Sequence, residues 1–173
     1  LAQSDSDYEF KFASSDWSAV NLGYGSFTMS GDDDAITLLD KGGNIGIKAD
    51  ESGAYLFELN YTDEANPVLK VSKSPIYIRG EMNGWGVVDK LTVSSTGHVY
   101  ASTLSLDAKE YEFKIATGNW STVNLGSGGQ DTLSEGVETT LGSGANLKFT
   151  PSSAGDYTFT FNQKAKTLVI TKG

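Results

Sequence analysis

The chain has 173 residues, 22 Asp or Glu against 13 Lys or Arg, a net charge of −9 and no Cys. This acidic balance argues against nucleic acid and anionic membranes as partners, because both recruit clustered Lys and Arg. The lack of Cys excludes disulfides and thiol chemistry, and no apolar stretch approaches the length of a membrane span. A neutral ligand is the natural partner for such a surface.

The first clear feature in chain order is the segment Tyr8–Gly25, YEFKFASSDWSAVNLGYG, which returns at Tyr111–Gly128 as YEFKIATGNWSTVNLGSG. The offset is a constant 103 residues, and 12 of the 18 positions are identical. Self-similarity at a fixed offset is the mark of a repeated structural unit. The sequence therefore predicts a tandem duplication of a unit of about a hundred residues.

Later segments recur as well. Gly43–Asn60 matches Gly144–Asn162 when one residue of slip is allowed, and a short apolar strand follows each. One copy therefore ends before Ser-Pro at positions 74 and 75, and the other ends at the last residues given. We expect two domains, residues 1–73 and residues 74–173, joined by a short linker.

The two copies begin differently. The second has 37 residues, 74–110, before Tyr111, whereas the first has seven before Tyr8. The extra segment holds at least two expected strands that have no counterpart in the first copy. We expect the first copy to be an N-terminally truncated module in a fragment or processed product, with an open sheet edge. Strands from another chain complete it, or it is stabilised differently.

Apolar and polar residues alternate in several short runs, and turn residues separate them. No stretch of a dozen residues has a period near 3.6, so we expect an all-β chain of tandem immunoglobulin-like β-sandwich modules. The inward positions of the matched strands should form the two cores. These pairs are Phe10/Phe113, Phe12/Ile115, Tyr55/Tyr157 and Phe57/Phe159.

Several motifs occur together. They are a G-x-M-N-x-W turn at Gly80–Trp85, a YEFK strand at Tyr111–Lys114 followed by Trp120, and the pieces Gly42–Ile45 and Gly53–Tyr55. As a set they resemble the starch- and glycogen-binding modules that precede many α-glucan enzymes. They also resemble the starch-binding modules of Bacteroidetes outer-membrane glycan-binding lipoproteins. The resemblance covers all of the second copy and most of the first.

The resemblance implies that two aromatic faces, a Lys and an Asn grip an α-glucan. The matching residues are Trp85, Lys114, Trp120 and Asn146 in the second copy, and Lys11, Trp17 and Asn44 in the first. The physical case agrees, because a flat indole covers the apolar face of a sugar ring while polar groups bond its rim. Asp16 and Asn119, each beside a Trp, could bond a sugar hydroxyl.

Other interpretations of these residues stay open. A Trp in a β-sandwich is often core, although polar neighbours in a turn favour exposure for all three. Lys11 and Lys114 could instead protect a strand edge against pairing. The run Asp32–Asp34 could suggest a calcium loop, but a solvated loop is the preferred interpretation, and we predict no metal site or cofactor.

Catalysis has little support in the sequence. His98 is the single His and has no nucleophile pattern around it, and no hydrolase or phosphate-binding motif occurs. A glycosidase would need two carboxylates held in a cleft, which two small sandwiches do not suggest. The sequence therefore predicts a protein that is not an enzyme.

The predicted function is non-catalytic binding of α-glucan, meaning starch, glycogen or maltooligosaccharide, through exposed Trp side chains. We expect a secreted or cell-surface bacterial protein that partners a glycoside hydrolase domain or a neighbouring chain, without nucleic acid or membrane insertion. The alternative is a structural or adhesive surface protein or filament subunit that assembles by strand complementation.

Overall fold

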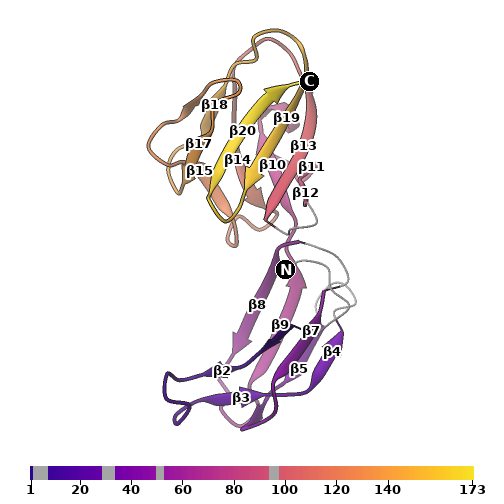
Figure 1. The fold of residues 1–173 in the computed structure, drawn as a ribbon, viewed down its shortest axis with the longest axis vertical. Helices are drawn as coiled ribbons and strands as arrows, with labels where there is room; N and C mark the ends of the chain where they lie inside the picture. Colours follow the sequence, from indigo (N-terminus) through magenta and orange to yellow (C-terminus); the bar gives the residue numbers. More distant parts are fainter. Residues whose placement is uncertain (2–7, 29–33, 50–52, 94–97) are drawn as a thin grey trace. The chain divides into compact units, whose positions relative to one another are not determined.

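The computed structural model describes residues 1, 8–28, 34–49, 53–93 and 98–173. Within these residues the chain is almost entirely β-strand, and its one helical element is the 3-10 turn η1 (Glu81–Asn83), so the all-β prediction is confirmed. No helix in the described part could cross a membrane. Backbone contacts separate two compact units, Leu1–Lys73 and Ser74–Gly173 (Figure 1).

The second unit is built from two groups of strands. The group that we call the β14 layer comprises β10 (Ile76–Gly80), β11 (Asp89–Lys90), β14 (Tyr111–Thr117), β15 (Asn124–Ser127), β16 (Thr132–Leu133) and β18 (Leu147–Phe149). The β19 layer comprises β12 (Thr92–Val93), β13 (Val99–Leu106), β17 (Thr139–Gly142), β19 (Gly155–Asn162) and β20 (Thr167–Lys172). Strand β15 pairs with both β14 and β17 and so joins the layers.

Aromatic rings fill the core between these layers. Phe113 of β14 meets Phe159 of β19 edge to face, with ring centroids 5.5 Å apart, and Phe149 of β18 meets Tyr157 at the same distance. All four side chains are almost completely buried. The alternation of the sequence explains this, because every second residue of a strand projects to the same face. The second unit is therefore a closed sandwich.

The first unit repeats much of this pairing with shorter strands. Its three small sheets are β1–β7–β4, β2–β3–β6 and β5–β9–β8. The strands are β1 (Tyr8–Phe10), β2 (Phe12–Ala13), β3 (Asn21–Gly23), β4 (Ser26–Thr28), β5 (Asp34–Thr37), β6 (Leu39–Asp40), β7 (Ile45–Lys48), β8 (Tyr55–Asn60) and β9 (Val68–Lys73). Phe10 pairs with Ile45, and Phe113 pairs with Leu147 in the second unit.

A close backbone approach is common to both copies. A Cβ atom on Gly23 would lie 1.9 Å from the carbonyl oxygen of Gly43, and one on Gly126 would lie 2.1 Å from that of Ala145. Only glycine fits at such a distance. This contact explains the glycine that ends Asn-Leu-Gly after the Trp loop in each copy.

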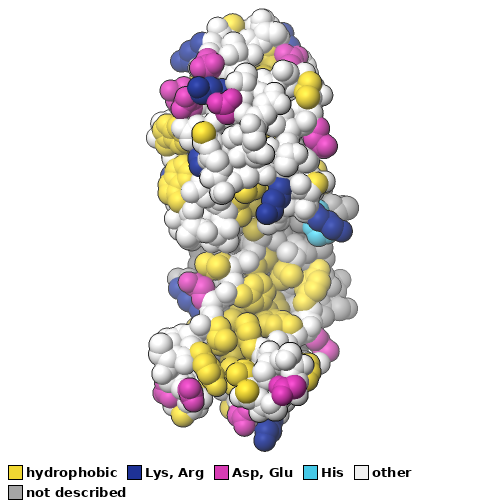
Figure 2. Space-filling model, turned by 90° about the vertical axis from the view of Figure 1, so that its left-hand side faces the viewer, with side chains coloured by type: hydrophobic (Ala, Val, Ile, Leu, Met, Phe, Trp, Pro, Cys, Tyr) yellow, Lys and Arg dark blue, Asp and Glu magenta, His cyan; other side chains and the backbone are white. Residues whose placement is uncertain are grey.

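The cores of the two units differ at the predicted pairs. Phe159 is fully buried, but its counterpart Phe57 is 36% exposed. The expectation that Phe57 is a core residue is therefore wrong, and the remaining first-copy members, Phe10, Phe12 and Tyr55, are only partly buried. In Figure 2 hydrophobic side chains gather visibly over the first unit.

The reason lies in the strands that cover the second core. There β10 pairs with β14, and β13 pairs along the whole of β19. Among the described residues of the first unit, β8 is the last strand of its sheet, and β1 and β2 each stand at a sheet end. A smaller core of Leu22, Leu38, Ile45, Ile47, Leu69 and Val71 holds this unit together.

Candidate functional site

All three tryptophans occupy turn positions with left-handed backbone. Their φ angles are 64° at Trp17, 63° at Trp85 and 62° at Trp120. A bulky residue seldom adopts this conformation, because its Cβ crowds the neighbouring carbonyl oxygen. The loops enforce it: the Trp17 N–H donates to Ser14 O at 3.0 Å, and the Trp120 N–H donates to Thr117 O at 3.2 Å. Strained residues of this kind cluster at functional sites.

Trp85 and Trp120 come together although 35 residues separate them in the sequence. Trp85 follows η1 at the end of β10, and Trp120 lies in the loop between β14 and β15. Their ring centroids are 6.2 Å apart and the ring planes are inclined at 39°. Both side chains are half-buried, so they are neither core residues nor fully exposed. The predicted pair therefore forms a contiguous aromatic surface.

Arg79 underlies this pair. Its guanidinium carbon lies 3.7 Å from the Trp120 ring centroid, and the side chain is buried. Nε and Nη2 donate to the Trp85 carbonyl at 2.9 and 2.7 Å, while Nη1 donates to the carbonyls of Thr117 and Gly118 at 3.1 and 3.0 Å. The planar Arg79 guanidinium thus donates hydrogen bonds to both Trp-bearing turns and stacks on the Trp120 ring.

Sequence reasoning missed Arg79 as a site residue. Arg79 is the single Arg of the chain and directly precedes the Gly80–Trp85 motif. This position next to the motif could have indicated that it belongs to the site. Its role depends on which carbonyl groups the pairing of β10 with β14 brings within reach of the guanidinium. That information is long-range and does not appear in a local pattern.

The polar residues of the motif shape the turn that carries Trp85. The Asn83 amide nitrogen donates to Ile78 O and to Asp89 Oδ2, each at 2.7 Å, and Asn83 Oδ1 accepts from the Gly80 N–H at 3.0 Å. The Trp85 N–H donates to Gly80 O at 2.8 Å. Asn83 therefore has a structural role in holding the ring-bearing turn.

Lys114 lies on the same outer face as this cluster. It is directly opposite Arg79 in the β10–β14 pair, and opposed residues project to the same face. Its Nζ donates to Gly144 O at 3.1 Å, which leaves further N–H donors for a ligand. Asn146, the other predicted residue here, donates to Glu112 Oε2 at 3.0 Å. Its amide nitrogen is thus already engaged by a carboxylate.

The first copy repeats these side-chain contacts. Lys11 Nζ donates to Gly42 O at 2.7 Å, and the Asn44 amide donates to Glu9 Oε2 at 3.2 Å. Lys11 Nζ also lies 5.7 Å from the Trp17 ring centroid, a cation–π distance. The structure therefore brings the predicted Lys and Trp together in this copy.

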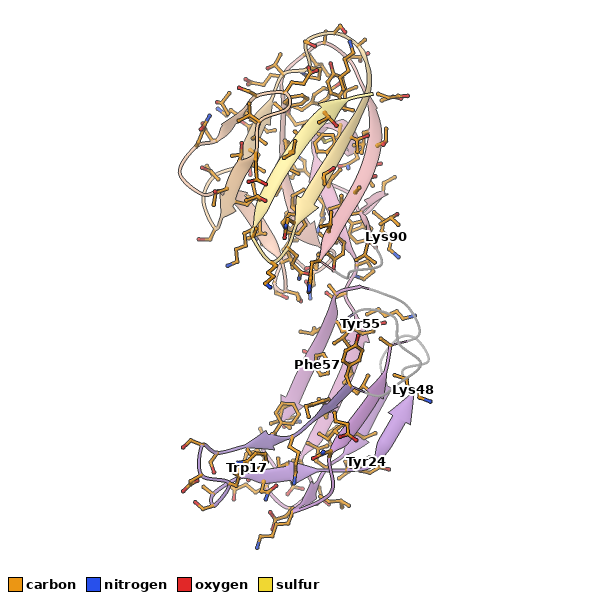
Figure 3. The ribbon with its side chains drawn as sticks, in the orientation of Figure 1. Trp17, Tyr24, Lys48, Tyr55, Phe57 and Lys90 are labelled. Carbon is orange, nitrogen blue, oxygen red and sulfur yellow. The ribbon has the colours of Figure 1, made fainter. Side chains whose placement is uncertain are left out.

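Trp17 is the most exposed of the three tryptophans. It lies in the loop between β2 and β3 and is labelled in Figure 3, and 54% of its surface is exposed. In the second copy, Trp85 and Arg79 come from the residues before Tyr111, whereas seven residues precede Tyr8 in the given sequence. Among the described residues of the first copy, Trp17 is the tryptophan with a lysine, Lys11, beside its ring.

Asp16 and Asn119 support the Trp loops from within. The Asp16 carboxylate accepts from the Ser18 hydroxyl at 2.7 Å, the Ser18 N–H at 3.1 Å and the Ser14 hydroxyl at 2.9 Å. The bonds from the Ser18 side chain and backbone, with that from Ser14, lower the pKa of Asp16 to about 2. Asn119 Oδ1 likewise accepts from the Thr117 hydroxyl and the Ser121 N–H. The Asp16 carboxylate and the Asn119 amide oxygen therefore accept hydrogen bonds from within their own loops.

Within the described part of the chain, no group of three or more His, Cys, Asp or Glu is placed to hold a metal ion. Asp32 and Asp33, the first two residues of the acidic run, lie outside the described residues.

Comparisons with known proteins give one distant likeness. No family model matches the chain, and no curated protein matches it. A solved structure described as the ligand-induced structure of AmyP-SBD matches with a TM-score of 0.44 and 17% sequence identity. The match covers 57% of this chain and 71% of that one.

Proposed function

We propose that the second unit binds a neutral α-glucan without catalysis, and that Trp85 and Trp120 are its contact surface. The observation that carries the proposal is the pair of half-buried indoles, 6.2 Å apart, on a rigid Arg79 support. Both positions have left-handed backbone, which bulky residues seldom adopt and which is enriched at functional sites, and both rings are half-buried and outside the core.

The inclination of the rings favours a curved ligand. An indole face covers the apolar C–H face of one sugar ring, and the buried area supplies the affinity. Two rings at 39° match successive sugars whose faces turn relative to each other, as in an α-1,4-linked chain, better than a flat ribbon. The Lys114 donors that Gly144 does not use are available to a rim hydroxyl.

We further propose that Trp17 and Lys11 form a weaker contact in the first unit. A single ring buries less sugar surface than a pair, so this contact alone should bind poorly. On a long polymer the two units could bind together and gain avidity, whereas a short oligosaccharide would not span them. This arrangement suits a secreted or cell-surface protein that holds a polysaccharide for a glycoside hydrolase.

Calorimetry with maltoheptaose tests the proposal. We expect a dissociation constant of about 10 μM to 1 mM, or roughly −7 to −4 kcal/mol. Trp120→Ala should remove about 1–3 kcal/mol of binding, because one large stacking side chain is lost. Trp17→Ala is the matched control and should leave the affinity for this short ligand nearly unchanged.

Cellohexaose provides the specificity control, since its chain is straight and β-linked. Equal affinity of wild type and a folded Trp120→Ala variant for maltoheptaose would contradict the proposed site. Tighter binding of cellohexaose than maltoheptaose would contradict the α-glucan assignment while leaving a carbohydrate site in place.

A further inference from the structure

A glutamate recurs two residues before the predicted lysine in both copies. Glu9 precedes Lys11 in this way at β1, and Glu112 precedes Lys114 in β14. Side chains two residues apart on an extended strand project to the same face. Because Phe113, which lies between Glu112 and Lys114, is fully buried, both of these charged side chains project away from the core. The carboxylate therefore shares the outer face of the β14 layer with the predicted lysine.

In each copy this carboxylate is held by the asparagine that the resemblance assigned to the ligand. The Asn146 amide donates to Glu112 Oε2 at 3.0 Å, and the Asn44 amide donates to Glu9 Oε2 at 3.2 Å. The other oxygen of Glu112, Oε1, lies 3.7 Å from Lys148 Nζ, which is longer than a hydrogen bond. A carboxylate has about four acceptor positions on its two oxygens. Glu112 therefore keeps acceptor positions for a ligand.

An ion pair across the sheet does not account for the recurrence of the glutamate. Lys148 of β18 stands opposite Glu112, but Gly46 of β7 stands opposite Glu9. A glycine has no side chain with which a carboxylate could pair. The feature common to both copies is thus the glutamate together with its asparagine, and the cation opposite is an addition in the second copy.

The backbone at Glu112 is tied to the turn that carries Trp85. The Glu112 N–H donates to Glu81 Oε2 at 3.0 Å, and Glu81 is the first residue of η1. The Trp85 N–H donates to the carbonyl of Gly80, and Gly80 pairs with Phe113, the neighbour of Glu112. The carboxylate therefore projects from backbone that is hydrogen-bonded to the same turn as the aromatic surface.

A sugar hydroxyl both donates and accepts hydrogen bonds, so a site for it needs groups of both kinds. Lys114 can only donate, and Asn119 Oδ1 already accepts from within its own loop. Glu112 supplies an acceptor next to the Lys114 donor. Hydrogen bonds to an ionised acceptor are stronger than those between neutral groups. The same charge would repel a sulfated or uronic-acid glycan, which favours a neutral glucan.

We propose that Glu112 contacts the sugar directly and that Asn146 is a positioning residue, which acts by holding the carboxylate. This inference rests on the α-glucan function proposed above for the aromatic surface. Glu112 accepts from hydroxyls of the glucan while Lys114 donates to them. Glu9 and Asn44 have the same two roles in the first copy.

Calorimetry with maltoheptaose on the 173-residue chain tests the role of Glu112. Glu112→Ala should weaken binding about tenfold or more, because a hydrogen bond to a charged acceptor is lost. Glu112→Gln keeps an acceptor oxygen without the charge and should weaken binding about threefold. Glu138→Ala is the matched control, since Glu138 is an exposed glutamate that accepts from the Thr167 hydroxyl on the β19 layer. It should bind as wild type does.

A double-mutant cycle tests the role of Asn146. Asn146→Ala alone should weaken binding about threefold, because the carboxylate is no longer fixed, and it should cause no further loss when added to Glu112→Ala. Additive losses would make Asn146 an independent sugar contact. Weakening by Asn146→Ala that equals or exceeds that of Glu112→Ala would assign the contact to the amide. Either result would overturn the positioning role, and urea unfolding checks that each variant is folded.

Carbon-13 NMR provides a readout that a merely structural role would not move. The side-chain carboxylate resonance that disappears in Glu112→Gln should shift when maltoheptaose saturates the wild type, and also when it saturates Asn146→Ala. A resonance that stays in place would overturn the direct contact.

Trp120→Ala keeps the failure of this inference distinct from the failure of the proposed function. Lost binding in Trp120→Ala together with full binding in Glu112→Ala would overturn only the role of Glu112. Undiminished binding in both variants, or no binding by the wild type, would overturn the aromatic site and the role of Glu112 together.

Discussion

Phe57 and Phe159 stand at matched positions of one repeated strand, yet the first is 36% exposed and the second is fully buried. Their pairing partners within each copy also match, since Phe57 pairs with Val71 and Phe159 with Ile170. The difference arises on the other side of the strand, where β13 covers Phe159. The alternation of a strand therefore decides which residues face inward, and its neighbours decide whether they are buried.

The Trp loops differ for the same reason. Trp17 and Trp120 stand in equivalent loops, but Trp120 also has Arg79 against its ring and Trp85 beside it. Both of these residues come from the segment that closes the second core. This segment thus completes the sandwich and also builds the aromatic surface.

The largest contrast between the copies should appear on truncating the matched phenylalanines. Phe159→Ala should lower the free energy of unfolding by about 3–5 kcal/mol, because it leaves a cavity among packed rings. Phe57→Ala should cost only about 1 kcal/mol, since part of its ring already contacts water. Urea unfolding followed by hydrogen exchange can assign each loss to its unit. Similar losses for both variants would mean that Phe57 is covered in solution.

Removing Arg79 should have the next largest effect, and only in the second unit. Arg79→Ala leaves the carbonyls of Trp85, Thr117 and Gly118 without their donor, and we expect a loss of about 1–3 kcal/mol in unfolding free energy. Arg79→Lys restores a charge but not the planar fork, so it should recover stability only in part. Maltoheptaose calorimetry should show both variants binding more weakly than wild type. Unchanged affinity in a folded Arg79→Ala variant would show that the rings hold their places without it.

The smallest expected difference between the copies concerns the residue before the matched tryptophans, Asp16 in the first and Asn119 in the second. Asp16 has a folded-state pKa of about 2, below its ordinary value of 3.8, so its carboxylate supports the first loop above about pH 4. That support is lost as the pH falls through about 2, when the carboxylate takes up a proton and gives up its bonds from Ser18 and Ser14. Fluorescence of Trp17, recorded in a Trp85→Phe/Trp120→Phe background, should follow this titration. Asp16→Asn, which copies Asn119, should remove it; a titration that persists in Asp16→Asn would assign it to another group.

Much of this architecture was predictable from the sequence. The alternating runs predicted the all-β class that the structure shows, and the 103-residue offset predicted two related units. The pairing of Trp85 with Trp120 agrees with the proximity that the motif resemblance implied. These predictions depend on local pattern or on internal repetition, which a single sequence carries in full.

What the sequence could not provide depends on contacts between distant strands. The burial of Phe10, Phe12 and Phe57 was predicted from alternation, but burial also depends on neighbouring strands such as those that pair beside Phe113 and Phe159. The role of Arg79 depends on carbonyls that pairing of β10 with β14 brings near. The engagement of Asn146 by Glu112 required the register between β14 and β18.

The left-handed backbone at the three tryptophans has a cost in folding stability, and this cost is tied to where the rings are placed. Glycine would adopt the φ of about 60° at these positions without the steric cost that a Cβ brings, whereas an indole there must be held by its loop. Selection for thermal stability alone would therefore favour replacing these rings, and selection for the sugar binding proposed above would preserve them. If the proposed binding holds, the backbone at each of these three turns sets stability against that binding.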